Sequence, residues 1–136
     1  MKVVLDTNVL IRIVRPDSAN YVVWRKLFLQ EYTMCYTSEI LLEYEEILSE
    51  HYSKDVANAV VNFILSLPNA ERITTYFRMR RLGGDADDNK FSDCAFAANA
   101  HYIVSDDKHF NELKSIDFPK IEVLKLKEFR EILDVQ

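Results

Sequence analysis

The sequence contains little cysteine, glycine or proline. Its two cysteines, Cys35 and Cys94, lie far apart in apolar segments, which excludes a disulfide framework and predicts reduced thiols in a cytoplasmic protein. Two glycines and three prolines in 136 residues exclude a collagen-like chain and predict connections that are short or built from polar residues. No apolar run approaches the roughly 18 residues of a membrane-spanning helix, so we expect no membrane-embedded segment.

An excess of positive charge is missing as well. Seventeen Lys and Arg residues stand against twenty-two Asp and Glu residues, which gives a formal net charge of −5. The chain is therefore not a polycation that binds nucleic acid through bulk charge, and a nucleic-acid partner requires a local device such as a metal ion. Hydrophobic residues make up 49% and charged residues 29%, which at this length predicts one globular domain over residues 1–136.

Strand-like and helix-like segments alternate along the chain. We expect strands at 2–5, 34–37, 72–76, 102–105 and 121–124, of which 72–76 has the weakest pattern. We expect helices at 21–30, 38–52 with Ser38 as N-cap, 54–67 with Ser53 as N-cap, 91–100 after a polar turn at 85–89, and 127–133. Strands separated by helices form right-handed parallel units with helices on both faces of the sheet. The pattern therefore predicts an α/β fold, a three-layer α/β/α sandwich with a central parallel sheet.

Acidic residues follow the predicted strands. They are Asp6 after the first strand, Asp106 and Asp107 after the fourth, and Asp85, Asp87 and Asp88 in the turn before the alanine-rich helix. Open parallel sheets bind their ligands at the carboxyl ends of the strands. We therefore expect these three segments to bring carboxylates to one edge of the sheet.

A glutamate on the second predicted helix joins this set. With Ile40 at zero and about 100° per residue, Glu43 falls at about 300° and borders the apolar stripe of Ile40, Tyr44, Ile47 and Leu48. A carboxylate so close to a buried face requires a partner, because an isolated buried charge is costly. A divalent cation at the strand ends would be such a partner.

A group of carboxylates from several segments is typical of a hard-metal site. Mg²⁺ and Mn²⁺ prefer oxygen ligands and reduce the repulsion that raises the pKa values of neighbouring carboxyls. In phosphodiester hydrolysis the ion attracts the anionic backbone, polarises the phosphoryl oxygen and lowers the pKa of a bound water. An acidic protein can therefore act on an anionic polymer when a cation lies between them.

Four segments, in chain order, carry a family resemblance. They are LDTNVL at 5–10, SEILLEYEEIL at 38–48, DADDNKFSDCAFAANAHYIVSDDKHF at 85–110, and the closing IEVLKLKEF. Together they resemble the PIN domain, in particular its bacterial branch of toxin components of toxin–antitoxin systems. The resemblance implies an α/β/α fold and a Mg²⁺- or Mn²⁺-dependent ribonuclease. It also implies an antitoxin partner and assembly as a homodimer or higher oligomer.

The resemblance assigns roles to individual residues. The family's site acids match Asp6, Glu43, Asp88 and Asp107, with Glu43 holding a metal-bound water or acting as general base. A further acid of this branch matches Asp93. Small polar residues that line the family's site, as hydrogen-bond partners of the acids or waters, match Asn8 and Ser105.

The sequence leaves some of these assignments open. Asp106 is an alternative to Asp107 after the fourth strand, and Asp88 is chosen from three acids in its turn. Asp93 lies about 200° from Phe91, so a solvent-facing side chain fits the pattern as well as a metal contact does. The number of ions, one or two, is also open.

A basic cluster precedes the acidic turn. Its members are Arg78, Arg80 and Arg81. A solvated surface is the default expectation for such a cluster, and contact with RNA phosphates is expected if the segment borders the cleft.

Two other functions fit parts of the sequence. A non-catalytic PIN-fold module that binds RNA or a protein partner would retain the acids as a structural cluster. A response-regulator receiver also surrounds Mg²⁺ with acids at strand ends. It requires an acid pair at the first strand and a phosphoacceptor Asp ending the middle strand, and this chain has Thr75 and Tyr76 near its third strand.

Overall fold

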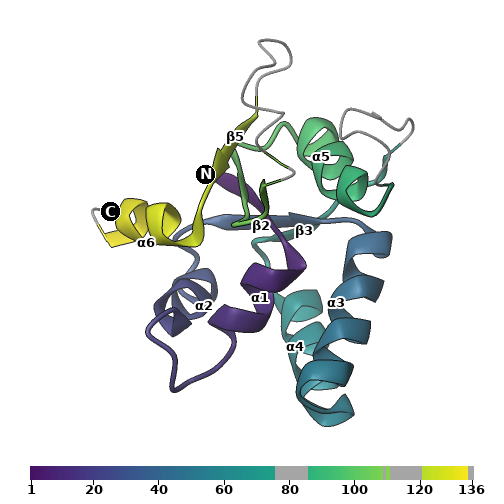
Figure 1. Cartoon of the computed structure of the whole chain (residues 1–136), viewed down its shortest axis with the longest axis vertical. Helices are drawn as coiled ribbons and strands as arrows, with labels where there is room; N and C mark the ends of the chain where they lie inside the picture. The colour runs from purple at the N-terminus through teal and green to yellow at the C-terminus, as the bar shows by residue number, and fades with distance from the viewer. Residues whose placement is uncertain (76–85, 109, 111–120, 135–136) are drawn as a thin grey trace.

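A five-stranded parallel sheet forms the centre of the fold (Figure 1). The computed structural model describes residues 1–75, 86–108, 110 and 121–134, without the side chains of 86–89. The strand order is β3-β2-β1-β4-β5, and each neighbouring pair is parallel. The strands are β1 (Lys2–Leu5), β2 (Thr33–Tyr36), β3 (Ala70–Arg72), β4 (Tyr102–Val104) and β5 (Glu122–Leu124). The helices are α1 (Thr7–Ile13), α2 (Tyr21–Phe28), α3 (Ser38–His51), α4 (Lys54–Ser66), α5 (Ala86–Ala98) and α6 (Leu126–Asp134).

Helices cover both faces of this sheet. Figure 1 shows α5 on one side of the sheet and α1 to α4 on the other, with α6 beside α2. The packing agrees with this view, because α5 contacts β1, β2 and β4, while α1 contacts α2 and α3. The three-layer α/β/α sandwich with a central parallel sheet is therefore confirmed.

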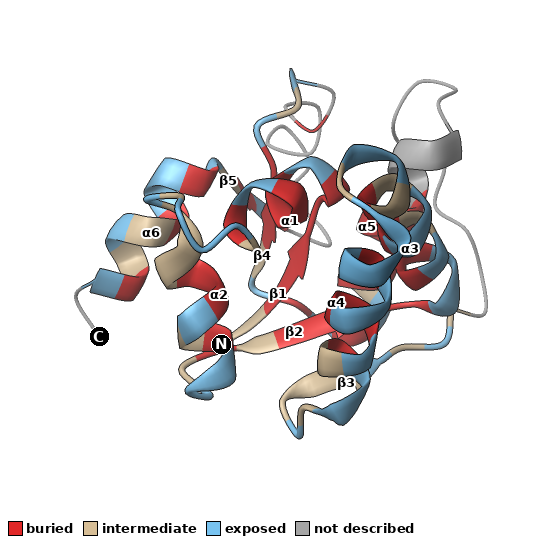
Figure 2. Ribbon diagram, turned by 90° about the horizontal axis from the view of Figure 1, so that it is seen from below, coloured by how far each residue is buried: buried red, intermediate tan, exposed pale blue. Residues whose placement is uncertain are grey.

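The core is built around β1. Val3, Val4 and Leu5 are fully buried, and Figure 2 shows β1 and β2 running as buried strands through the centre. A strand covered by helices on both faces is apolar on both, which explains why this run does not alternate with polar residues. Cys35 and Cys94 are buried in the same core and are free thiols, as expected. In the described part of the chain, no helix is both long enough and apolar enough to span a bilayer.

Capping side chains begin α3 and α4. Thr37 Oγ1 accepts a hydrogen bond from the Ile40 amide at 3.1 Å, so Thr37 is the N-cap of α3. The prediction of Ser38 as N-cap is wrong, because Ser38 is already the first helical residue. Ser53 caps α4 as predicted and accepts from the Val56 amide at 3.1 Å. Both threonine and serine are preferred at this position, so composition alone does not choose between neighbours.

The third strand lies earlier than predicted. β3 covers Ala70–Arg72, whereas the strand was expected at 72–76. Its register against β2 pairs Met34 with Ala70 and Tyr36 with Arg72. The Ile73 amide still donates to the Tyr36 carbonyl oxygen at 2.7 Å. The segment predicted as the strand therefore overlaps only the end of the pairing between β3 and β2.

Two helical segments were also predicted incompletely. No helix was predicted at α1. The helix has only seven residues, about two turns, and five of them are buried, so its apolar residues do not show a clear helical period. α5 begins at Ala86 rather than at residue 91. The segment expected as a polar turn is therefore largely the first turn of this helix, which accommodates Asp and Asn readily near its beginning.

Tyr44 connects α3 to the end of β1. Its side chain is fully buried, and its hydroxyl donates to the Leu5 carbonyl oxygen at 2.5 Å. Tyr44→Phe removes this donor from a buried carbonyl, so we expect the free energy of unfolding to fall by about 1–2 kcal/mol in urea denaturation. Tyr52→Phe is the comparison, because the Tyr52 hydroxyl donates to Ile11 at 2.6 Å in a half-buried position. An equal loss in both variants would contradict the role given to burial.

Candidate active site

Asp6 lies where β1 ends and α1 begins. Its amide donates to the Val104 carbonyl oxygen at 3.0 Å, which extends the pairing of β1 with β4 by one residue. Asp6 occupies the N-cap position of α1, but its side chain makes no capping hydrogen bond. Instead, Asp6 Oδ2 accepts from Ser105 Oγ at 2.8 Å. The Asp6 carboxylate is therefore held at the carboxyl ends of two adjacent strands rather than on the helix.

The environment of Asp6 favours its neutral form. The residue is 7% exposed, and this burial raises the pKa of its carboxyl. The hydrogen bond from Ser105 lowers that pKa in part, while the negative charges of Asp107 and Glu43 raise it further. A carboxylate that is desolvated and close to two others is stabilised most effectively by a cation.

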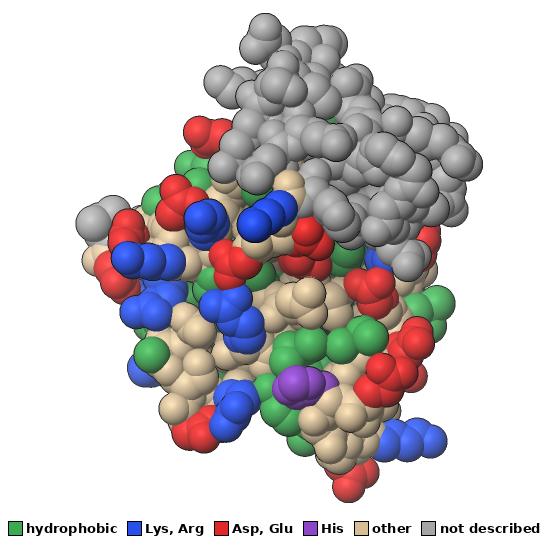
Figure 3. All heavy atoms as spheres, in the orientation of Figure 1, with side chains coloured by type: hydrophobic (Ala, Val, Ile, Leu, Met, Phe, Trp, Pro, Cys, Tyr) green, Lys and Arg blue, Asp and Glu red, His purple; other side chains and the backbone are tan. Residues whose placement is uncertain are grey.

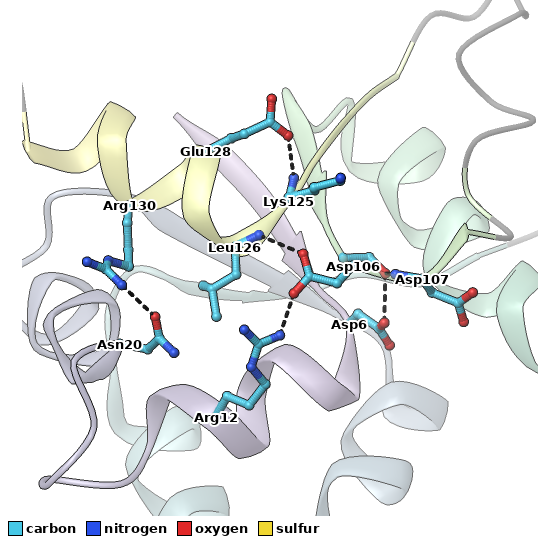
Figure 4. A network of polar contacts seen from close by, with 10 residues as sticks. Asp6, Arg12, Asn20, Asp106, Asp107, Lys125, Leu126, Glu128 and Arg130 are labelled. Carbon is cyan, nitrogen blue, oxygen red and sulfur yellow. Dashed lines mark hydrogen bonds and ion pairs between the residues drawn. The ribbon is translucent and has the colours of Figure 1, made fainter.

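The two aspartates after β4 point to different places (Figure 4). Asp106 forms an ion pair with Arg12 on α1, and its Oδ1 accepts from the Leu126 amide at the start of α6 at 3.2 Å. Asp107 lines a pocket together with Asp6, and its amide donates to Ser105 Oγ at 2.9 Å. Ser105 thus contacts both pocket acids. Of the two alternatives left open by the sequence, the geometry favours Asp107 as the pocket residue.

Glu43 reaches the same pocket from α3. It is half-buried, as its position beside the apolar stripe predicts. Its Oε2 accepts a hydrogen bond from Thr7 Oγ1 in the first turn of α1. Its Oε1 lies 2.7 Å from Lys90 Nζ on α5. Three helices therefore determine the position of this single carboxylate.

Lys90 is a site residue that the sequence analysis missed. Its side chain is 5% exposed, and its ammonium lies 5.3 Å from the centroid of the Phe91 ring, within the range of a cation–π contact. Lysine is almost never fully buried unless it is paired. In the sequence, Lys90 lies between acidic residues and the apolar Phe91, which is compatible with a paired lysine. Because the helix was expected to begin at residue 91, the Lys90 side chain could not be assigned to a helix face.

The pocket itself has a volume of about 210 Å³ and is lined by residues of α1, α3 and α5 and by the residues that follow β1 and β4. Its lining residues are Asp6, Thr7, Asn8, Glu43, Ile47, Phe91 and Asp107. The carboxylate donors fit a hard divalent ion, and such ions retain several waters when few protein ligands are present. In the described part of the chain, no three acidic, His or Cys side chains form a group that could hold a metal ion. Within the pocket, Asp6 and Asp107 both contact Ser105, while Glu43 is held by Thr7 and Lys90.

The remaining predicted residues either do not line this pocket or lie outside the described residues. The backbone of Asp88 is in the first turn of α5, but its side chain is outside the described part, as are Asp85, Arg78, Arg80 and Arg81. Asp93 is 5% exposed, so a solvent-facing position is excluded. The pocket lining given above does not include Asp93, and α5 is buried around much of its circumference because the sheet and α3 both pack against it.

A larger groove adjoins the acidic pocket. It has a volume of about 640 Å³ and shares Asn8 and Ile47 with the pocket. Its other lining residues include Arg12, Arg15, His51 and Tyr52, from α1, α3 and the segments that follow them. Figure 3 shows that acidic and basic side chains alternate over this face rather than forming one patch of a single sign. The groove therefore offers cations beside a pocket of carboxylates.

Comparison with known proteins supplies the family. A model described as PIN domain matches residues 2–109. VapBC2 from Rickettsia felis, bound to a DNA fragment from its promoter, has a similar structure, with a TM-score of 0.61, 18% identity, and coverage of 92% of this chain and 98% of that chain. DNA-bound VapBC from Salmonella typhimurium has a TM-score of 0.60 and 17% identity, with coverage of 93% of this chain and 98% of that chain. VapBC-1 from nontypeable Haemophilus influenzae has a TM-score of 0.58 and 10% identity, with coverage of 93% of this chain and 99% of that chain. No curated protein matches significantly. The likeness to these structures shows a shared fold, and the match over most of the sequence shows that this chain belongs to the PIN domain family.

Proposed function

We propose that this chain is a Mg²⁺- or Mn²⁺-dependent endoribonuclease and the toxin component of a toxin–antitoxin pair. The observation that carries the proposal is the meeting of Asp6, Glu43 and Asp107, from three separate segments, in one pocket at the strand ends. Membership of the PIN domain family supports a nuclease. The similarity to VapBC structures supports the toxin–antitoxin role.

The chain's own residues divide the work of such a site. Asp6 and Asp107 would hold the ion, with Asp88 as the further ligand that the family resemblance implies. The bound ion would polarise the phosphoryl oxygen and lower the pKa of a water. Ser105 orients the two aspartates through its hydroxyl. Glu43, held by Thr7 and Lys90, would accept the proton of the attacking water, and in-line hydrolysis would leave a 5′-phosphate.

Incubation with labelled RNA tests this function. The purified protein should cleave RNA in Mn²⁺ or Mg²⁺, stop on addition of EDTA, and yield products with 5′-phosphate ends. DNA of the same sequence is the control for substrate class. Cleavage that persists in EDTA would contradict the metal dependence, and intact RNA over a broad panel of sequences would contradict the nuclease.

RNA is proposed to enter along the groove that adjoins the pocket. Arg15 lines this groove and forms a bidentate ion pair with Asp17. Its Nε donates to Oδ1 at 3.2 Å and its Nη2 donates to Oδ2 at 3.0 Å. Cations on a groove wall contact phosphates, and an acidic protein needs such local contacts to hold an anionic strand. The arginine cluster at 78–81 lies outside the described residues and stays a prediction, and this groove is the candidate for RNA contact among the described residues.

Arg15→Ala should weaken the binding of single-stranded RNA. If Arg15 contacts one phosphate, the slope of log affinity against log salt concentration should become shallower by about 0.7. Binding is measured by fluorescence anisotropy in EDTA, so that the RNA stays intact. Arg25→Ala is the matched control, because it removes the same charge from α2 outside this groove. Equal effects of the two variants would show a bulk-charge effect and contradict the groove.

Partners are proposed on the same basis. The family resemblance implies an antitoxin partner and assembly as a homodimer or higher oligomer. Light scattering of the purified chain tests the oligomeric state. Exposed apolar side chains support protein contacts, since Phe28 is 60% and Leu29 57% exposed. The free, buried cysteines fit the cytoplasmic location that we also propose.

A non-catalytic PIN-fold module that binds RNA or a protein is the second candidate. It is favoured by one observation, the ion pair of Lys90 with Glu43, which neutralises a pocket carboxylate without a metal. The cleavage assay separates the two functions, because this module would bind RNA or a protein partner with or without Mn²⁺ and leave RNA intact.

A further inference from the structure

Lys90 places a positive charge against Glu43, one of the carboxylates that line the pocket. Its side chain is 5% exposed, and its Nζ lies 2.7 Å from Glu43 Oε1. A buried ammonium is costly unless a carboxylate and further contacts compensate it. The face of the Phe91 ring, 5.3 Å from Nζ, adds a second favourable contact. This lysine is thus a fixed part of the site rather than a mobile surface cation.

Both oxygens of Glu43 are engaged as a result. Lys90 contacts Oε1, and Thr7 Oγ1 donates to Oε2. A carboxylate held in this way by a cation and a hydroxyl has less capacity to serve as a direct metal ligand.

The arrangement of the charges leads to the same conclusion. Of the three described carboxylates of the pocket, Glu43 is the one that the Lys90 ammonium contacts, whereas Asp6 and Asp107 both contact Ser105. A two-metal site would instead require a carboxylate such as Glu43 to bridge or bind a second cation, and Lys90 already occupies that side of it.

We propose that Lys90 is a built-in cation that holds Glu43 where a second metal ion would otherwise do so, and that the pocket takes one divalent ion on the side of Asp6 and Asp107. The proposal rests on the metal-dependent function proposed above. Lys90 is a positioning residue, because it acts through Glu43.

Counting Mn²⁺ ions tests this directly. Electron paramagnetic resonance of free Mn²⁺, titrated into the full-length protein, should give about one bound ion per chain for the wild type. Lys90→Gln keeps a hydrogen-bond donor but removes the charge, so it should bind about two. Lys90→Arg restores the cation and should return the count to about one. A merely structural lysine would change stability in these variants without changing the count.

The outcomes separate the inference from the function on which it rests. Two ions on the wild type, with RNA cleavage intact, would overturn the role of Lys90 and leave the nuclease standing. This count requires no variant, so it decides even if Lys90→Gln fails to fold. One ion on a folded Lys90→Gln variant would also overturn the role. A wild type that binds no Mn²⁺ and leaves RNA intact would overturn both, and Asp6→Asn should lose the ion if it lies in this pocket.

Discussion

An Asp6→Asn variant should lose RNA cleavage by about 100-fold or more and yet unfold at a higher temperature at neutral pH in the absence of metal. Residues that only support metal ligands already contribute about 10–100-fold to activity or metal affinity, and Asp6 is proposed as a ligand itself. The gain in stability follows from its surroundings, because Asn fills nearly the same space without a charge that must be desolvated beside Asp107 and Glu43.

The stability difference should depend on pH in a defined direction. The pKa of Asp6 is raised in the folded protein from an ordinary value of 3.8, mainly by burial. The folded state therefore binds a proton more readily than the unfolded state, and wild-type stability falls as pH rises from about 4 through the folded pKa. Thermal unfolding in EDTA should show the variant more stable at pH 7 and the two proteins converging below about pH 4. A variant less stable than the wild type at pH 7 would contradict this account of Asp6.

The Asp107→Asn and Asp106→Asn variants should differ sharply in their rates of RNA cleavage, although the two residues are adjacent in the sequence. Asp107 lines the pocket, so its variant should lose cleavage by about 100-fold or more. Asp106 is directed to Arg12 and the Leu126 amide, so its variant should keep cleavage within about threefold of the wild type and lose at most about 1 kcal/mol of stability, as for exposed ion pairs.

The pair of variants is its own control. Both remove one negative charge after β4, so a general electrostatic effect on the anionic RNA would strengthen binding equally in the two variants. Single-turnover cleavage at saturating Mn²⁺ measures the chemical step in each. A larger loss in Asp106→Asn than in Asp107→Asn would reverse the assignment of the pocket residue.

The sheet and the meeting of its acids could be predicted because parallel strands end at one edge. Asp6 and the acids after β4 follow buried apolar runs, and adjacent parallel strands bring their ends together. Glu43 could be placed because helical periodicity over α3 puts it beside a buried stripe. These predictions depend on patterns spread over many residues, which survive errors of one or two positions.

The details that decide the chemistry depend on single positions. Ile103 and Val104 are both fully buried, so β4 has no alternation of polar and apolar residues to tell which of two following aspartates faces the pocket. The ion pair of the buried Lys90 with the half-buried Glu43 joins two helices that are distant in the sequence. The short helix α1, which brings Thr7 to Glu43, was missed for lack of length. Tertiary contacts determine each of these.

The central claim is that carboxylates from separate segments share one divalent ion in this pocket. Its most direct test is a crystal structure of the protein soaked in Mn²⁺, with anomalous scattering recorded to locate the ion. We expect a peak within about 2.0–2.3 Å of carboxylate oxygens of Asp6 and Asp107. A Mn²⁺-soaked crystal with no peak between these two side chains, obtained from protein that cleaves RNA, would contradict the claim.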